Sequence, residues 1–504
     1  MITMNALSNH SVEERRIFDK THLRDYALII LGIGIITVIY HLIFGQLTPS
    51  VIPGPTSPPG DPSGLPPQQP PNQGGGLKSF MNSWPIWGTL TMPNIWQILL
   101  GISIISFSLL FIWKIYPRVP TRLKVFAIII FSISTILLTN LIQGWEAGIV
   151  NSIGSPDGIY QDAVGITSIV EFISNYETLQ PTLTTHALTQ PPGAVVAIYI
   201  LYLLFGNPAG IAIGLASICT VVSIFTLKRI FSKFLSEDIS TLGAFLFGIL
   251  PAIQVYYLAN IYAIVSTLAV LALYFYMHEN VMISYAGLIS TIFLGSFTSF
   301  LFLTIPLAFL LYEVLGCIVE FQKAEHDSML AIIESILKPL SVGVSIIAIY
   351  ALLELTIGFN YVSAFLYASA SENPEGFMLI SNPLQYFVTR IQDVLDILIF
   401  LGPVLIALCY RGIKELRAAE LSSENQKMLL FVIASFLALA LLFLTGAPKK
   451  GETARICMFI LPFVLLPVLY RIDTGGYSKR QQLILLSVVF IQAVLIQLFG
   501  TYVW

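Results

Sequence analysis

Twelve long apolar runs constrain the fold of this chain more than any other feature. They cover residues 27–45, 95–115, 124–142, 239–256, 259–277, 282–297, 299–319, 339–357, 393–410, 428–446, 456–470 and 482–500. A helix needs about 20 apolar residues to cross the hydrocarbon core of a bilayer. The short alternating segments of a membrane β-barrel are absent. Since the 504 residues are 56% hydrophobic and only 11% charged, the sequence predicts an all-α membrane protein and not a soluble domain.

The stretch 193–227 decides the topology. It is long enough for two short helices, broken at Gly206-Asn207-Pro208, or for one broken and partly re-entrant element. Counted as one crossing, it puts 19 Lys and Arg residues on the side of the N-terminus and five on the other side. Because Lys and Arg concentrate in cytoplasmic loops, we favour this count, with about 13 transmembrane helices. The N-terminus is then cytoplasmic and the C-terminus extracytoplasmic.

The N-terminal part of the chain divides into three segments. Residues 1–26 are expected to be a cytoplasmic N-terminus, and residues 27–45 a first transmembrane helix, because no small-residue cleavage site follows this run. Residues 46–92 are rich in Pro and Gly and cannot bury a core. They are expected to form an extended extracytoplasmic tether.

The remainder, residues 93–504, is expected to be one multi-span domain. Its two long outer segments are an acidic loop at 143–191 and a cap at 358–392, which is rich in aromatic, Ser and Asn residues. The four cysteines lie inside apolar runs and are expected to be buried thiols. The apolar spans themselves are almost free of charge.

The loop 143–191 is acidic and has no Lys or Arg. Its five acids are Glu146, Asp157, Asp162, Glu171 and Glu177. Carboxylates held at a membrane surface suggest a general base or a metal site. Glu146 follows Trp145, which is an interfacial anchor at that depth and would fix the height of the carboxylate. Asp157 lies between Pro156 and Gly158, where a turn is expected.

Asp162 opens the stretch 162–176, whose apolar residues share one helical face. This pattern predicts an amphipathic helix along the interface. An acid near a helix N-terminus also favours the helix dipole, so a structural role for Asp162 stays open. His186 and the pair Pro191-Pro192 close the loop. Two prolines preset the start of the next helix, and a lone His at an interface is more often a hydrogen-bonding partner than a metal ligand.

Cations gather in a late outer loop, Lys449-Lys450-Gly451-Glu452-Thr453-Ala454-Arg455. Three of the five outer basic residues are here, and Arg455 opens the next apolar run. Its guanidinium is expected at the level of the lipid headgroups, where fixed cations suit a lipid phosphate. Ordinary snorkelling of Lys and Arg to the interface is the alternative.

In their order along the chain, these features resemble the GT-C superfamily, polytopic glycosyltransferases that take sugar from polyprenyl-phosphate donors. The resemblance covers residues 120–470 approximately. It rests on Tyr160 and Asp162 in the acidic loop, His186 before Gln190-Pro191-Pro192, a Pro251 to Asn260 turn, and Gly451-Glu452-x-x-Arg455. Related proteins often have His at the position of Gln190 and Asp near that of Asn260.

The resemblance implies a GT-C-like core and an inverting sugar transfer to a hydroxyl at the extracytoplasmic face. Asp162 or Glu146, with Asp157 as a further candidate, would be the general base. Arg455, with Lys449 and Lys450, would bind the donor phosphate. Supporting residues would be Tyr160, His186, Gln190, Asn260 and Glu452.

The implied partners are a polyprenyl-phosphate sugar and a lipid, glycan or protein acceptor, in the plasma membrane. A divalent metal is compatible with the acids, but no ligand spacing requires one. No basic face indicates nucleic acid.

Two other classes stay open. A lipid or glycan transporter or flippase would carry ionisable residues near the middle of its spans, whereas here the acids collect in an outer loop. A catalytically inactive subunit with the same fold is kept open by Gln190 and Asn260, where the chain departs from the usual pattern.

Overall fold

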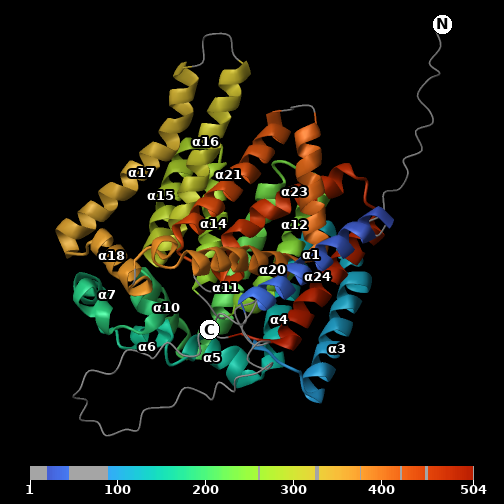
Figure 1. Ribbon diagram of the computed structural model, residues 1–504, viewed down its shortest axis with the longest axis horizontal. Coiled ribbons are helices and arrows are strands. Elements are labelled where there is room, and N and C mark those ends of the chain that lie inside the picture. Colours follow the sequence, from blue (N-terminus) through green and yellow to red (C-terminus); the bar gives the residue numbers. More distant parts are fainter. Residues whose placement is uncertain are drawn as a thin grey trace.

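The computed structural model describes residues 20–44, 89–258, 261–323, 329–374, 376–419, 423–448 and 452–502. Helices make up nearly all of these residues (Figure 1). The two strands among them, β1 (Thr89–Leu90) and β2 (Gly500–Thr501), pair antiparallel with Thr89 opposite Thr501. The expected all-α architecture is therefore confirmed for the described chain.

Nine helical stretches among the described residues are long and apolar enough to cross a membrane. Their helices are α3 (Ile95–Leu110) with η1 (Phe111–Ile115) and η2 (Tyr116–Arg118), α4 (Thr121–Asn140) with η3 (Leu141–Gln143), α11 (Pro208–Phe231), α15 (Val281–Thr298), η6 (Phe300–Leu303) with α16 (Thr304–Lys323), α17 (Met329–Ile357), α20 (Pro383–Ala418), α21 (Ser423–Thr445) and α24 (Lys479–Phe499). These properties fit a multi-pass membrane protein.

Several further apolar helices are not among these nine stretches, although the sequence predicted them to be transmembrane spans or parts of one. They are α1 (Lys20–Phe44), α10 (Gly193–Phe205), α12 (Glu237–Ile249), α13 (Pro251–Tyr256), α14 (Tyr262–Tyr276) and α23 (Leu461–Thr474). The run 239–256 is broken between α12 and α13, because Leu250 is extended and Pro251 begins the next helix. The count of 13 spans stays a prediction.

The structure resolves the arrangement of the stretch 193–227. Gly206 ends α10 in the left-handed conformation, and the side chain of Asn207 caps α11 by accepting from Gly210 N at 2.9 Å. With 13 residues, α10 spans only about 20 Å. Its start follows the acidic loop directly, and Pro208 at its far end packs against Gly154 of the same loop. Both ends of α10 therefore lie beside this loop, and the count of one crossing for 193–227 stays a prediction.

Close helix packing and a buried polar network build the core. A Cβ on Gly248 of α12 would lie 2.3 Å from Ser132 Oγ of α4, so only glycine allows this approach. Asn140 at the end of α4 donates to Gln254 O of α13 at 2.8 Å and accepts from Gln497 Nε2 of α24 at 2.9 Å. These bonds tie α4, α13 and α24 together close to the acidic loop.

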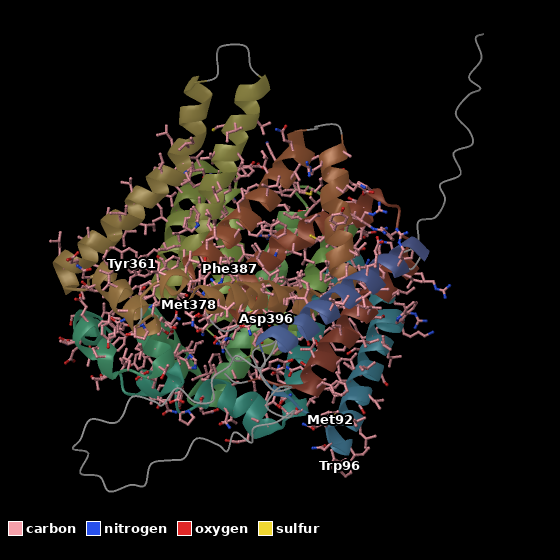
Figure 2. All side chains as sticks on the ribbon, viewed as in Figure 1. Met92, Trp96, Tyr361, Met378, Phe387 and Asp396 are labelled. Carbon is pink, nitrogen blue, oxygen red and sulfur yellow. The ribbon has the colours of Figure 1, made fainter. Side chains whose placement is uncertain are left out.

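The two ends of the molecule differ in character. The short helices of the loop 143–191, with α5 (Asn151–Gly154), α6 (Ile159–Val164) and α7 (Ile169–Ser174), gather at what we call the loop end, the lower edge of Figure 1. Met92 and Trp96, 87% and 75% exposed, project at the same end of α3 (Figure 2). An exposed Trp at a helix end is typical of the membrane interface.

Helix α20 consists of two halves separated at Gly402. This residue has φ 79° and ψ 159°, and Pro403 follows it. A Cβ on Gly402 would lie 1.9 Å from Gln492 Oε1, whose amide Nε2 donates to Ile399 O at 2.8 Å. Because Pro403 cannot donate a backbone hydrogen bond, the pair Gly402-Pro403 accounts for the break in the helix. The outer half, residues 383–401, carries residues that position the site below.

Candidate active site

A cavity of about 540 Å³ lies at the loop end. Its polar lining residues are Ser152, Ser155, Asp157, Tyr160, Thr185, His186, Thr189, Gln190, Tyr262, Ser369, Glu372, Asn373, Thr445, Glu452 and Arg455. Apolar side chains of Phe300, Leu301 and Phe365 form another part of the wall, from η6 and from α18 (Tyr361–Glu372). The cavity thus has both a charged region and an apolar region.

Several residues predicted from the sequence meet in this cavity although they are far apart in the chain. They are Asp157, Tyr160, His186, Gln190, Glu452 and Arg455. Asp162 and Glu146 are not among the lining residues. Lys449, Lys450 and Asn260 lie outside the described residues, as does most of the predicted tether. Their predicted roles stay predictions.

The acidic loop is a chain of short helices. The expected amphipathic helix over 162–176 is wrong: α6 ends at Val164, and α7 begins at Ile169 after the N-cap Ser168. The acidic loop also contains η4 (Glu146–Val150) before these helices, and α8 (Tyr176–Leu179), η5 (Gln180–Thr182) and α9 (Thr185–Leu188) after them. Gly165 and the capping Ser168 both favour helix ends, and they outweigh the apolar periodicity.

Asp162 braces this loop. Its carboxylate accepts from Thr184 N at 3.2 Å and from Thr184 Oγ1 at 2.5 Å, which joins α6 to the start of α9. Two donors from one residue fix the carboxylate in place and hold the Asp157 and His186 segments together. A structural role, which the sequence left open, therefore accounts for the observed contacts of Asp162.

Glu146 lies apart from the cavity. It is exposed in the first turn of η4, next to Trp145, which is 54% exposed. The interfacial position of Trp145 and Glu146 stays a prediction, and Glu146 is not among the residues that line the cavity.

Buried hydrogen bonds fix the residues before α10. Tyr176 is fully buried, and its hydroxyl donates to Gln190 O at 2.5 Å. Burial raises the pKa of Tyr176, and the negative charge of Asp162 adds to this effect, so the phenol keeps its proton. Gln180 donates to Leu188 O at 2.8 Å and to Ala364 O of α18 at 3.1 Å. The loop and the cap are thereby joined at the cavity.

Arg455 is the most deeply buried cation in the cavity wall, with 3% exposure. It lies in α22 (Thr453–Ile456) and forms an ion pair with Glu452. Burial is the largest single influence and lowers the pKa of Arg455, but Glu452, Tyr262 and Tyr256 together outweigh it and raise that pKa above its usual value. A permanently charged guanidinium at a cavity wall can bind an anion through two parallel N–H bonds.

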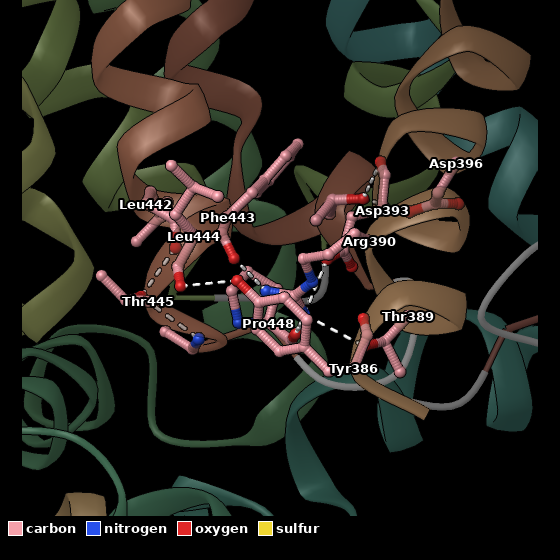
Figure 3. A network of polar contacts seen from close by, with 12 residues as sticks. Tyr386, Thr389, Arg390, Asp393, Asp396, Leu442, Phe443, Leu444, Thr445 and Pro448 are labelled. Carbon is pink, nitrogen blue, oxygen red and sulfur yellow. Dashed lines mark hydrogen bonds and ion pairs between the residues drawn. The ribbon is translucent and has the colours of Figure 1, made fainter. Parts of the chain in front are cut away.

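The structure adds three residues that sequence reasoning missed: Arg390, Asp393 and Asp396, all on the outer half of α20 (Figure 3). Asp396 is completely buried and is labelled near the middle of the view in Figure 2. The expectation that the spans are almost free of charge is wrong here. Their spacing of three residues within an apolar helix was the available signal, because it puts all three on one face.

The cavity contains acids and a histidine, which are residue types that can bind metal ions. In the part of the chain that the structure describes, no group of three or more His, Cys, Asp and Glu side chains could hold a metal ion. The cavity lining combines carboxylates, His186 and a buried guanidinium, residue types that suit proton transfer and anion binding.

Similarity to known proteins does not place this chain in a family. No family model matches the sequence, and no curated protein matches it either. Among solved structures, the apo form of an oligosaccharyltransferase from Archaeoglobus fulgidus is similar, with a TM-score of 0.44 and 12% sequence identity over 75% of this chain. The aligned part spans 56% of that enzyme. A likeness of this size assigns neither family nor activity.

Proposed function

We propose that this protein is an integral membrane glycosyltransferase that moves a sugar from a polyprenyl-phosphate donor to a hydroxyl acceptor. One observation carries the proposal: the exposed residue Asp157 and the buried residue Arg455 line the same cavity, and His186 lines it as well. A base and a fixed cation facing one cavity are the two groups that an inverting transfer needs.

Asp157 is the best candidate for the general base. It lies in the turn before α6 and is exposed, so an acceptor hydroxyl can reach its carboxylate. The Asp162 carboxylate is engaged by Thr184, which leaves it less suited to taking a proton. We therefore assign the base to Asp157 in preference to Asp162 and Glu146.

Arg455 is the candidate for the leaving-group site. In the proposed step, the acceptor oxygen forms a bond to the anomeric carbon, while the bond from that carbon to the phosphate oxygen breaks. The acceptor proton passes to Asp157, and the electron pair of the broken bond stays on the phosphate. Arg455 would stabilise the charge that grows there. The apolar wall at Phe300 and Phe365 suits the lipid part of the donor.

The distribution of basic residues supports an extracytoplasmic cavity. Arg390 and Arg455 are the Lys or Arg residues described beside the cavity segments, whereas Lys228 of α11, Arg411 of α20 and Lys479 of α24 lie toward the opposite ends of their helices. Lys and Arg accumulate on the cytoplasmic side of membrane proteins. The cavity would then open on the outer face.

The transporter alternative gains no support from the charges inside α20. Arg390 and Asp396 bind backbone groups of the segments that flank residues 449–451. Ionisable groups on a transport path would instead face a water-filled passage. An inactive subunit is favoured by one observation, the existing pair between Arg455 and Glu452, since a donor phosphate must compete with Glu452.

The test is sugar release by purified protein in detergent from a panel of polyprenyl-phosphate sugars, run with Asp157→Asn and Arg455→Ala. We expect release from one donor class, reduced at least about 100-fold by Asp157→Asn because a general base contributes that much. Folded protein that releases no sugar from any donor would contradict the proposal and favour the inactive subunit.

A further inference from the structure

Two buried carboxylates and one arginine occupy a single face of the outer half of α20. Asp393 and Asp396 are completely buried, with 0% exposure, and none of the three residues lines the cavity. Burying a charge costs free energy unless it is paired or hydrogen-bonded. The contacts that these groups make are therefore informative about why the helix holds them.

Arg390 holds the segment that precedes residues 449–451. Its guanidinium donates to Phe443 O and Pro448 O and pairs with Asp393 at 2.9 Å (Figure 3). One turn earlier, Tyr386 donates to Leu444 O at 2.7 Å, and the Arg390 guanidinium lies 5.2 Å from the centre of its ring. The end of α21 is thus attached to α20 through backbone carbonyls.

Asp396 holds the segment that follows residues 449–451. Its Oδ2 accepts from Ala454 N at 2.6 Å and from Thr453 Oγ1 at 3.4 Å, and Thr453 Oγ1 also donates to Asp393 O at 2.6 Å. Ala454 N lies in the first turn of α22, where backbone N–H groups have no acceptor within the helix, so the Asp396 side chain satisfies one of these donors. Arg455 is the next residue.

We propose that Arg390 and Asp396 are positioning residues that hold both flanks of residues 449–451 and so direct Arg455 into the cavity. The structural part stands on these contacts alone, and its consequence for donor binding rests on the proposed function. Five of the six contacts on the flanking segments go to backbone atoms of those segments or of α20, so they specify chain position independently of the neighbouring side chains.

Cys457 provides a direct probe of this positioning. It is a free thiol, 1% exposed, two residues after Arg455. In full-length protein with Cys219→Ala, Cys317→Ala and Cys409→Ala, labelling of Cys457 by a maleimide measures local opening of α22. Asp396→Ala is expected to raise the labelling rate roughly tenfold, the effect of losing a buried hydrogen bond, and Asp396→Asn, which keeps an acceptor, should restore the wild-type rate.

Asp473→Ala is the matched control. The Asp473 carboxylate also accepts from one backbone N–H and one hydroxyl, Ser236 N at 3.2 Å and Ser236 Oγ at 3.0 Å, between other helices. It should leave Cys457 labelling unchanged. If Asp396→Ala does not fold, Thr453→Val removes the bond to Asp393 O and should accelerate labelling in the same direction. Wild-type labelling rates in Asp396→Ala or in folded Thr453→Val would overturn the proposal.

The functional consequence is tested by a double-mutant cycle on the affinity for polyprenyl phosphate. Asp396→Ala should weaken binding about tenfold in the wild-type background and have no effect when Arg455 is already Ala, because Asp396 acts through Arg455. Equal weakening in both backgrounds would overturn the positioning role. If the wild-type protein does not bind the lipid phosphate, the proposed function fails, while the labelling result still decides the structural part.

Discussion

The Asp396 carboxylate accepts a hydrogen bond from the backbone N–H of Ala454 at 2.6 Å, across 58 residues of sequence. This bond joins a buried position in an apolar helix to the residue before the cavity arginine. On the segment that precedes residues 449–451, Arg390 makes the corresponding contact by donating to Pro448 O. Helix α20 therefore contributes to the cavity without lining it, which explains why it carries charges at positions where lipid-facing helices have none.

Replacing Thr184 by Val is expected to loosen the acidic loop without unfolding the protein. The change removes the 2.5 Å bond to Asp162 and should destabilise the loop locally by about 1–2 kcal/mol. Hydrogen exchange over residues 159–188 would become faster. The control is Thr182→Val, which removes a local bond to Leu179 O at 2.7 Å. Equal protection in wild type and Thr184→Val would show that Asp162 does not brace the loop.

Glu452→Gln is expected to change stability and donor affinity in opposite directions. Loss of the carboxylate leaves the buried Arg455 guanidinium without its ion-pair partner, which should destabilise the protein by about 1–3 kcal/mol. The same change removes the group that competes with a donor phosphate, so polyprenyl phosphate should bind more tightly.

Thermal unfolding and lipid titration in detergent measure the two effects of Glu452→Gln. Glu237→Gln is the control, because it breaks an exposed pair with Lys228 at 2.8 Å and should change neither quantity by more than about 1 kcal/mol. Weaker lipid binding by Glu452→Gln would contradict a phosphate site at Arg455.

Gly402→Ala should destabilise the protein far more than an ordinary helical substitution. The added methyl would meet Gln492 and would be forced to a φ of 79°, a strain of about 1–3 kcal/mol before the clash is counted. Gly316→Ala in α16 has open space around it, and it should be neutral or slightly stabilising. Melting temperatures of the two variants provide the comparison. Equal temperatures would mean that the break in α20 is not needed for folding.

Tyr176→Phe should cost less stability as the pH rises. Because the folded-state pKa of Tyr176 lies above the unfolded value of about 10, its hydroxyl contributes fully below pH 10 and loses that contribution as the pH rises further. We expect a loss of about 1–2 kcal/mol for Tyr176→Phe at pH 8, since Gln190 O loses its donor. Unfolding temperatures of both proteins between pH 8 and 11 should converge, and a constant gap would contradict the buried donor.

Much of the helical frame could be predicted from the sequence, because a bilayer imposes length and apolarity on each span. The runs at 95–115, 124–142 and 482–500 became α3, α4 and α24. Predictions failed where local chemistry competes with periodicity. The stretch 162–176 has an apolar face, yet Gly165 and Ser168 divide it into two helices. The run 239–256 is divided in the same way by Pro251.

The candidate site was predictable in part. Asp157, His186 and Arg455 were selected for their residue types and their positions beside apolar runs, and these features are local. The bracing contact of Asp162 is not a local feature, because it depends on Thr184, 22 residues later, lying within hydrogen-bonding distance of its carboxylate. Arg390 and Asp396 were missed for a similar reason, since each is defined by carbonyl or amide groups about 55 residues later.

The sequence by itself determined that the chain forms long apolar helices, that five acids and no Lys or Arg lie in the loop 143–191, and that three basic residues lie in the loop 449–455. These properties follow from the transfer free energies of the side chains, which depend on residue type and not on the fold. Only the tertiary structure decided that Asp157 and Arg455 share a cavity, that Asp162 is a brace, and that α20 holds the arginine in place. Contacts between segments depend on how helices pack, and packing is set jointly by many residues that no local pattern records.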